Sequence, residues 1–301
     1  MSNINNYLNL IRFYNPIGFW LLLWPGIWGL FISENLTIQN FVIVIIGAFL
    51  TRSIGCAVND ILDRNIDGSV KRTASRPLAT GELKPFEAII FTLILAVLAL
   101  IMLSLTSNYA IKIVMFVAIP LIVLYPLAKR FFLLPQLILG LTFGLSLPIS
   151  YAIANDSITI EILFLYMGCA CWITAYDSFY ALTDYNDDKK IKVNSLPITF
   201  KSDTYKVVNI FFILFIVSIV SYSYVNSSSI MTLGILFLFF QMFHQNKLSI
   251  NGKHLAAFKS NSHVGAVLAI IFFIEHQSEF CLLYTSPSPR DTLLSRMPSS
   301  A

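Results

Sequence analysis

Apolar runs recur along the whole chain, and they constrain its fold more than any other feature. Most are close to the roughly 20 residues that a membrane-spanning helix needs. No polar linker separates them, so we predict one all-α, polytopic membrane bundle of about nine helices rather than two soluble domains. The runs cover 15–36, 40–58, 86–106, 109–127, 133–154, 160–181, 207–225, 229–244 and 263–275.

Basic residues alternate between successive connections of this bundle. Only 12% of the residues are charged and 56% are hydrophobic, so the net charge of +4 gives no indication of nucleic-acid binding. By the positive-inside rule, the N-terminus and every second loop face the cytoplasm. Connections that contain Lys or Arg are 61–85, 127–135, 183–206 and 245–263, and connections without either are 34–40, 155–159 and 226–228.

A first polar motif, NDILDRNIDGSVKRTASRPLATG at 59–81, follows the second apolar run. Asn59, Asp63 and Asp67 are spaced i, i+4, i+8, so they would line one face of a helix that continues out of that run. Arg52 extends the stripe inward, where an arginine is costly unless it faces a polar cavity or a partner. The alternative is an arginine that snorkels to the membrane interface.

A second polar motif, YDSFYALTDYNDDKKIKVNS, covers 176–195. Asp184 and Asp188 are again spaced i, i+4, and Asp177 lies two turns earlier on about the same face. Two carboxylate clusters on one membrane side would repel each other unless positive charge lay between them. Carboxylate oxygens suit Mg²⁺, which shares its coordination shell with substrate phosphates.

Lysine and arginine side chains on the same side complete a binding site for diphosphate, because arginine forks and magnesium bind it together. The alternative is positive-inside charge with acidic helix caps, which needs no substrate. A transporter or channel, a further alternative, would place charges near the membrane midplane, whereas here they gather at one interface. The candidate cations are Arg64, Lys71, Arg72, Arg76, Lys129, Arg130, Lys189 and Lys190.

The two motifs resemble the aspartate-rich motifs of the UbiA superfamily of intramembrane prenyltransferases. Four further segments are similar to this superfamily, specifically to its 4-hydroxybenzoate polyprenyltransferase branch, and the resemblance covers about residues 5–274. These segments are NPIGFWLLLWPGIWGL at 15–30, RSIGCAVND at 52–60, YPLAKRFFLLPQLILG at 125–140 and AAFKSNSHVG at 256–265.

The resemblance implies Mg²⁺-dependent transfer of a polyprenyl group from polyprenyl diphosphate to the ring of 4-hydroxybenzoate, ortho to the hydroxyl, in ubiquinone biosynthesis. Other acceptors within the superfamily are a naphthoate, homogentisate or haem. The resemblance also implies helices around a central cavity, with an apolar tunnel for the polyprenyl tail that opens to the lipid bilayer. The implied metal-binding residues are Asn59, Asp63, Asp67, Asp184 and Asp188, and the four aspartates among them are also implied to be catalytic.

Roles for the remaining site residues follow from this reaction. Asp177 is a candidate partner for the acceptor hydroxyl or the ring proton. Arg52 and Arg130 are candidates for the aromatic carboxylate, and Arg72 and Arg76 for the diphosphate, with Arg64 and Lys129 as further substrate-binding residues. The faces of Tyr125, Phe179 and Tyr180 either shield an allylic cation or serve only in packing.

The last apolar segment, VGAVLAIIFFI at 264–274, departs from this pattern. Its 11 residues give only ~16 Å of helix, whereas a bilayer core needs ~30 Å. We therefore expect a truncated last helix, a prenyltransferase domain over 1–275 and a polar tail over 276–301 that is disordered or not native to the fold. We expect a bacterial inner membrane location with the active site on the cytoplasmic side, or alternatively the mitochondrial inner membrane.

Overall fold

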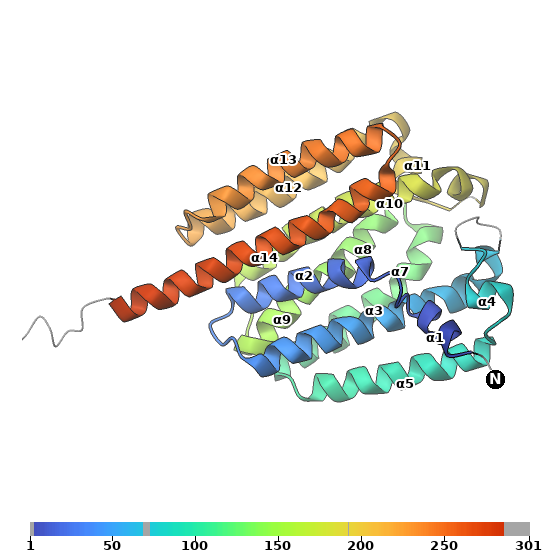
Figure 1. Ribbon diagram of the computed structural model, residues 1–301, viewed down its shortest axis with the longest axis horizontal. Coiled ribbons are helices and arrows are strands. Elements are labelled where there is room, and N and C mark those ends of the chain that lie inside the picture. The colour runs from blue at the N-terminus through green and yellow to red at the C-terminus, as the bar shows by residue number, and fades with distance from the viewer. Residues whose placement is uncertain (1–2, 69–72, 192, 286–301) are drawn as a thin grey trace, which may run out of the picture.

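The structure, a computed structural model, describes residues 3–68, 73–191 and 193–285. Within these residues every regular element is a helix, and the long helices run back and forth side by side (Figure 1). The long elements are α2 (Ile17–Ile32), α3 (Ile38–Asp67), α5 (Pro85–Ser104), α7 (Ile119–Phe131), α10 (Ile160–Ile191), α12 (Thr204–Val225), α13 (Met231–Ile250) and α14 (His254–Thr285). The shorter ones are α1 (Ile4–Leu10), α4 (Pro77–Thr80), α6 (Asn108–Ile113), η1 (Val114–Ala118), α8 (Pro135–Gly144), α9 (Ser146–Asn155), α11 (Leu196–Phe200) and η2 (Lys201–Asp203).

Each predicted apolar run falls on a helix or on consecutive helices, which confirms an all-α, polytopic membrane fold. The count of nine spans is not confirmed. In the described residues, seven segments are long and apolar enough to cross a membrane, and α2 is a shorter apolar helix of 16 residues. The helix α13 has 20 residues, but its second half carries polar side chains such as Gln241 and Gln245, which lower its hydropathy.

The centre of the bundle is an aromatic core around α10. Trp28, Trp172, Tyr176, Phe179 and Phe215 are all fully or almost fully buried. The Trp172 ring lies 5.2 Å from Trp28 and 5.5 Å from Phe215, between centroids. These rings join α10 to α2 and α12, and α10 also packs against α8 and α14. In contrast, α5 turns large apolar side chains outward, as expected for a helix that faces lipid.

Glycines allow close approach between two pairs of these helices. Gly29 on α2 lies against the Leu147 backbone carbonyl on α9, so a side chain at Gly29 would collide with it. Gly140 on α8 lies in the same way against the Ala170 carbonyl and the Thr174 hydroxyl on α10. Small residues at such contacts let membrane helices pack backbone to backbone.

The last helix is longer than the sequence predicts, and the expectation of an 11-residue truncated helix is wrong. The helix α14 has 32 residues, which is about 48 Å, and it projects beyond the rest of the bundle at one end (Figure 1). Its polar first turns are helical because their side chains are bonded inside the bundle. The Asn261 amide donates to Gln245 at 2.9 Å, and Gln241 donates to Ser260 at 2.7 Å.

The continuation of α14 to Thr285 also carries the helix past residue 275, the boundary proposed for the domain. Glu275 is buried in this helix. The remainder of the expected tail, 286–301, lies outside the described residues. The domain boundary itself stays a prediction.

Both polar motifs lie at one end of the bundle. The C-terminal ends of α3 and α10 are found there together with α1, α4 and α11 (Figure 1). The connections between α2 and α3 and between α12 and α13 lie at the opposite end. This arrangement agrees with the alternation of basic and non-basic connections in the sequence.

The glycine contacts give a first prediction. We expect Gly140→Ala to destabilise the protein by about 1–3 kcal/mol, because the added methyl group must push α8 away from α10. The matched control is Gly47→Ala on α3, where an added Cβ meets nothing within 4 Å. That change should stabilise slightly, by about 0.5–1 kcal/mol. The midpoint of thermal unfolding in detergent micelles measures both, and equal midpoints would contradict the packing described here.

Candidate active site

The first aspartate motif lies on an unbroken helix. Because α3 continues to Asp67, Asn59, Asp63 and Asp67 lie on successive turns, as the sequence predicts. Asn59 and Asp63 are half-buried, and Asp67 is buried. The hydroxyl of Thr73 donates to the Asp67 backbone carbonyl at 2.9 Å, which satisfies one of the open carbonyls at the helix end.

The second aspartate motif is likewise helical throughout. Asp177, Asp184 and Asp188 all lie on α10, and all three are half-buried. Beyond the helix, the chain is held by α8, since the Leu196 backbone N–H donates to the buried Gln136 side chain at 2.9 Å. The spacing of the two motifs is therefore confirmed as helical, and their ends share one side of the bundle.

Four charged side chains form an ion-pair cluster at the end of α3. Arg76 Nη1 lies 2.8 and 3.0 Å from the two carboxylate oxygens of Asp67, and 3.0 Å from Asp60 Oδ1. Arg12 Nη2, from the segment that joins α1 to α2, lies 2.6 Å from the same Asp60 oxygen. The cluster thus joins the N-terminal segment, α3 and the start of α4.

Burial makes this cluster energetically important. The Asp60 side chain is completely buried, and a buried carboxylate is very costly without opposite charge beside it. Burial lowers the pKa of the Arg12 guanidinium, but the Asp60 carboxylate outweighs this effect, and the net shift of the pKa is upward. Asp60 Oδ2 is buried and has no hydrogen-bond partner in the described part of the chain.

Arg52 is half-buried between helices, as expected for a residue that faces the bundle interior. Its guanidinium carbon lies 5.9 Å from the centroid of the Phe143 ring on α8, within the range of a cation–π contact. Gly18 on α2 leaves room for it, because an added Cβ there would lie 2.5 Å from Arg52 Nη2. Its contacts are thus with α2 and α8, and its role in substrate binding stays a prediction.

Among the predicted cations whose side chains the structure describes, only Arg76 belongs to the cluster. Arg64 is exposed, and its Nη1 lies 3.5 Å from the Ile61 carbonyl of its own helix. Arg72 lies outside the described residues, as do the side chains of Lys129 and Arg130 on α7. Arg76 is therefore the predicted diphosphate ligand that the described structure places against a predicted aspartate.

The predicted metal ligands are not gathered into a cluster either. In the part of the chain that the structure describes, no three His, Cys, Asp or Glu side chains are grouped as ligands of one ion. The donor atoms are nevertheless all oxygens on two helices that end on one side, which fits a hard ion such as Mg²⁺. The five-residue metal set therefore stays a prediction.

Sequence reasoning missed three residues of this region. Asp60 follows Asn59 in the first motif, but it does not share the helix face of Asn59, Asp63 and Asp67. The helical spacing therefore gave no signal for it. Arg12 lies 48 residues from Asp60, and no local spacing links them. Tyr176, next to Asp177, is buried with a hydroxyl that has no hydrogen-bond partner among the described residues.

The aromatic residues singled out in the sequence have packing contacts. Phe179 is fully buried in the core, and the Tyr180 ring lies 4.9 Å from that of Phe258. Tyr125 packs against the same core from α7. These contacts support the packing interpretation, and shielding of a cation stays untested.

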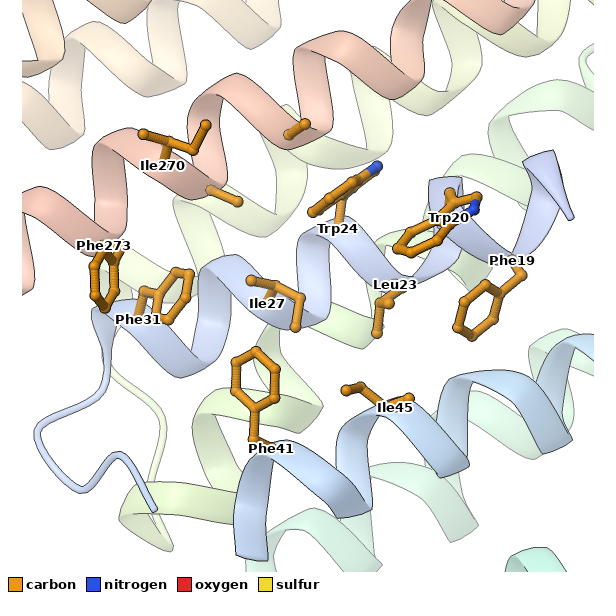
Figure 2. Close-up of a pocket in the computed structure, with 12 residues that line it drawn as sticks. Phe19, Trp20, Leu23, Trp24, Ile27, Phe31, Phe41, Ile45, Ile270 and Phe273 are labelled. Carbon is orange, nitrogen blue, oxygen red and sulfur yellow. The ribbon is translucent and has the colours of Figure 1, made fainter. Parts of the chain in front are cut away.

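An apolar groove runs along the outside of α2, between α3 and α14 (Figure 2). Its volume is about 520 Å³, and three of its lining side chains, Trp20, Ile270 and Phe273, are more than 40% exposed. One end of the groove, at Phe19 and Trp20, adjoins Gly18 and therefore Arg52. Its lining side chains are Phe19, Trp20, Leu23, Trp24, Ile27, Phe31, Phe41, Ile45, Ala266, Ala269, Ile270 and Phe273.

Fold and site together define a class: a multi-pass α-helical membrane protein with two aspartate motifs at one end and an apolar groove lined by α2, α3 and α14. The model of the UbiA prenyltransferase family matches residues 22–271. The chain belongs to this family.

Relatives of known name agree with this assignment. The 4-hydroxybenzoate octaprenyltransferase of Pasteurella multocida is 37% identical over 276 residues, which cover 88% of this chain and 93% of the relative. The protein of the same name from Histophilus somni is 36% identical over 278 residues, covering 89% and 96%.

Two solved structures share the fold. The apo structure of a UbiA homologue from Aeropyrum pernix has a TM-score of 0.76 at 19% identity and covers 86% of this chain and 97% of that one. A UbiA homologue from Archaeoglobus fulgidus, bound to GPP and Mg²⁺, has a TM-score of 0.71 at 19% identity and covers 91% and 99%.

The ion-pair cluster gives a second prediction. We expect Arg76→Gln to destabilise the protein by about 3 kcal/mol or more, because it leaves two buried carboxylates with one guanidinium. The matched control is Lys206→Gln, which removes an exposed ion pair to Asp203 (2.8 Å) and should have no measurable effect. Unfolding by SDS in mixed micelles measures both variants. Equal effects of the two substitutions would refute the importance assigned to the cluster.

Proposed function

We propose that this chain transfers a polyprenyl group from polyprenyl diphosphate to the ring of 4-hydroxybenzoate, in ubiquinone biosynthesis. The observation that carries the proposal is the pair of aspartate motifs at one end of a membrane bundle whose helices α2, α3 and α14 also line an apolar groove. An anionic head group with a long apolar tail needs both a polar site and an apolar surface on the same protein. The names of the relatives supply the acceptor.

Magnesium is the proposed cofactor. Asn59, Asp63, Asp67, Asp184 and Asp188 would hold it, together with oxygens of the diphosphate, since all of these groups offer the hard donors that the ion prefers. When bound, the ion would neutralise charge that develops on the diphosphate leaving group.

Arginines supply the remaining positive charge in this proposal. The planar fork of Arg76 can bond diphosphate oxygens more strongly as the allylic C–O bond breaks and negative charge grows on them. Arg72 and Lys129 would assist it from the same side. Arg64 is a more distant candidate, given its exposed position.

The acceptor is proposed to bind deeper, near Arg52. The half-buried guanidinium beside Phe143 suits an aromatic carboxylate, which can accept its hydrogen bonds while the acceptor ring packs on apolar side chains. Arg130 is the second candidate for this carboxylate. The ring carbon ortho to the hydroxyl then forms the new C–C bond and loses its proton, which Asp177 would accept.

The apolar groove is proposed to hold the polyprenyl tail. Its lining is aromatic and aliphatic, and its end at Phe19 lies near Arg52 through Gly18. A tail that leaves the polar end of the bundle would therefore meet apolar surface at once, and burial of that surface favours binding.

We propose a bacterial inner membrane as the location, with the aspartate end facing the cytoplasm. Support comes from the basic connections on that side and from the bacterial sources of the relatives. The mitochondrial inner membrane is the alternative.

The reaction gives a third prediction. Membranes that contain the protein should transfer a labelled prenyl group to 4-hydroxybenzoate, and EDTA should abolish the product. Asp63→Asn and Asp184→Asn should each lower the rate by about a hundredfold or more, because each removes charge stabilisation at the leaving group. Asp203→Asn, in an exposed ion pair, is the matched control and should retain full activity. Folded protein without product would refute the benzoate assignment and direct the assay to naphthoate, homogentisate and haem.

The groove gives a fourth prediction. Ala266→Phe should fill part of the groove and raise the KM for a long-chain prenyl diphosphate by about tenfold or more. Geranyl diphosphate, with a short tail, should be much less affected. Ala256→Phe is the matched control, because Ala256 is exposed on the same helix and does not line the groove. Equal effects on long and short substrates would place the tail elsewhere.

A further inference from the structure

Arg76 is shared between two carboxylates that have different positions relative to the proposed reaction. It contacts both oxygens of Asp67, at 3.0 and 2.8 Å, and one oxygen of Asp60, at 3.0 Å. Asp67 is a proposed metal ligand, whereas Asp60 is not one and its side chain is completely buried. In this arrangement Arg76 occupies the oxygens that Asp67 would have to offer to a metal ion.

Arg12 and Arg76 compete for the same atom of Asp60. Both contact Oδ1, Arg12 at 2.6 Å and Arg76 at 3.0 Å. The other oxygen, Oδ2, is buried and lacks a hydrogen-bond partner in the described part of the chain. Asp60 therefore has bonding capacity that this arrangement does not use.

The backbone at Arg12 has a conformation that usually favours glycine. Arg12 has φ of 60°, in the left-handed region, and follows the C-terminus of α1. Its N–H donates to the Asn9 carbonyl at 3.1 Å, and the N–H of Phe13 donates to the Leu8 carbonyl at 2.9 Å. This is the Schellman pattern, in which glycine is the favoured residue at the left-handed position. This backbone conformation places the Arg12 guanidinium where Nη2 contacts Asp60 and Nη1 donates to the Asn9 carbonyl at 3.0 Å.

We propose that Asp60 is a positioning residue: it retains Arg76 at the site when Asp67 binds the metal ion that carries the diphosphate. Arg12, which contacts the same oxygen of Asp60, limits how strongly Asp60 attracts Arg76. When Asp67 releases Arg76, the guanidinium keeps one buried carboxylate partner and can direct its remaining donors to the diphosphate. Without Asp60, Arg76 would have Asp67 as its only partner in the cluster and would hold it against the metal. This inference rests on the proposed function.

Binding tests the proposal without turnover. The probe is Mg²⁺ with a non-hydrolysable thiolodiphosphate analogue of geranyl diphosphate, and the readout is the analogue concentration that gives half of the maximal thermal stabilisation in detergent. Asp60→Asn should raise this concentration by about tenfold or more, as expected for loss of a charged hydrogen bond. Asp60→Glu, which keeps the charge, should restore most of the affinity. Asp203→Asn is the matched control and should bind like the wild type.

Arg12→Gln separates positioning from a merely structural role. It removes the competitor from Asp60 Oδ1, so Arg76 can move toward Asp60 and Asp67 is freed. The variant should be less stable than the wild type but should bind the analogue at least as tightly. A structural role predicts instead that both Asp60→Asn and Arg12→Gln weaken binding in step with their loss of stability.

The outcomes are distinct. Wild-type affinity in Asp60→Asn, or weaker binding by Arg12→Gln, overturns the positioning role and leaves the proposed function intact. If Asp60→Asn does not fold, the direction of the change in Arg12→Gln decides alone. If the wild-type protein does not bind the analogue, both the proposed function and this inference are refuted.

Discussion

A carboxylate that is fully removed from water inside a membrane bundle needs positive charge in direct contact with it, and Asp60 is such a group. The contacts come from two segments that are far apart in sequence, one before α2 and one at the start of α4. Neutralisation of one charge thereby fixes the N-terminal segment and the connection after α3 at the end of the bundle that carries both aspartate motifs. The geometry of the proposed diphosphate site depends on this local requirement.

Much of the fold follows from local sequence patterns. Apolar runs of spanning length become helices, and i, i+4 spacing places Asp63 and Asp67, or Asp184 and Asp188, on successive turns. The shared end of the two motifs follows from the alternation of connections. The length of α14 does not follow, because hydropathy treats Ser260 and Asn261 as the end of a span. In the structure these polar groups bond to other buried side chains and lie inside the helix.

The candidate site likewise follows in part from local sequence patterns and in part from tertiary contacts. Sequence identifies the aspartates because they repeat with helical spacing, but several lysines and arginines occupy the same connections, and spacing does not rank them. Only the tertiary arrangement places Arg76 on Asp67 and turns Arg64 outward. The contact of Arg12 with Asp60 depends on the path of the chain between α1 and α2, which no local pattern specifies. The family resemblance likewise implies an apolar tunnel, yet it does not indicate that α2, α3 and α14 line the groove.

The position of the groove determines how a ligand would enter it. It lies on the outer side of α2, with Trp20 and Phe273 exposed, so in a bilayer the hydrocarbon would reach it from the side. Any molecule lodged there exchanges with lipid in the plane of the bilayer. Its occupancy is then governed by mole fraction in the membrane and by two-dimensional diffusion. Added lipid should dilute such a ligand even when its total concentration in the vessel is constant.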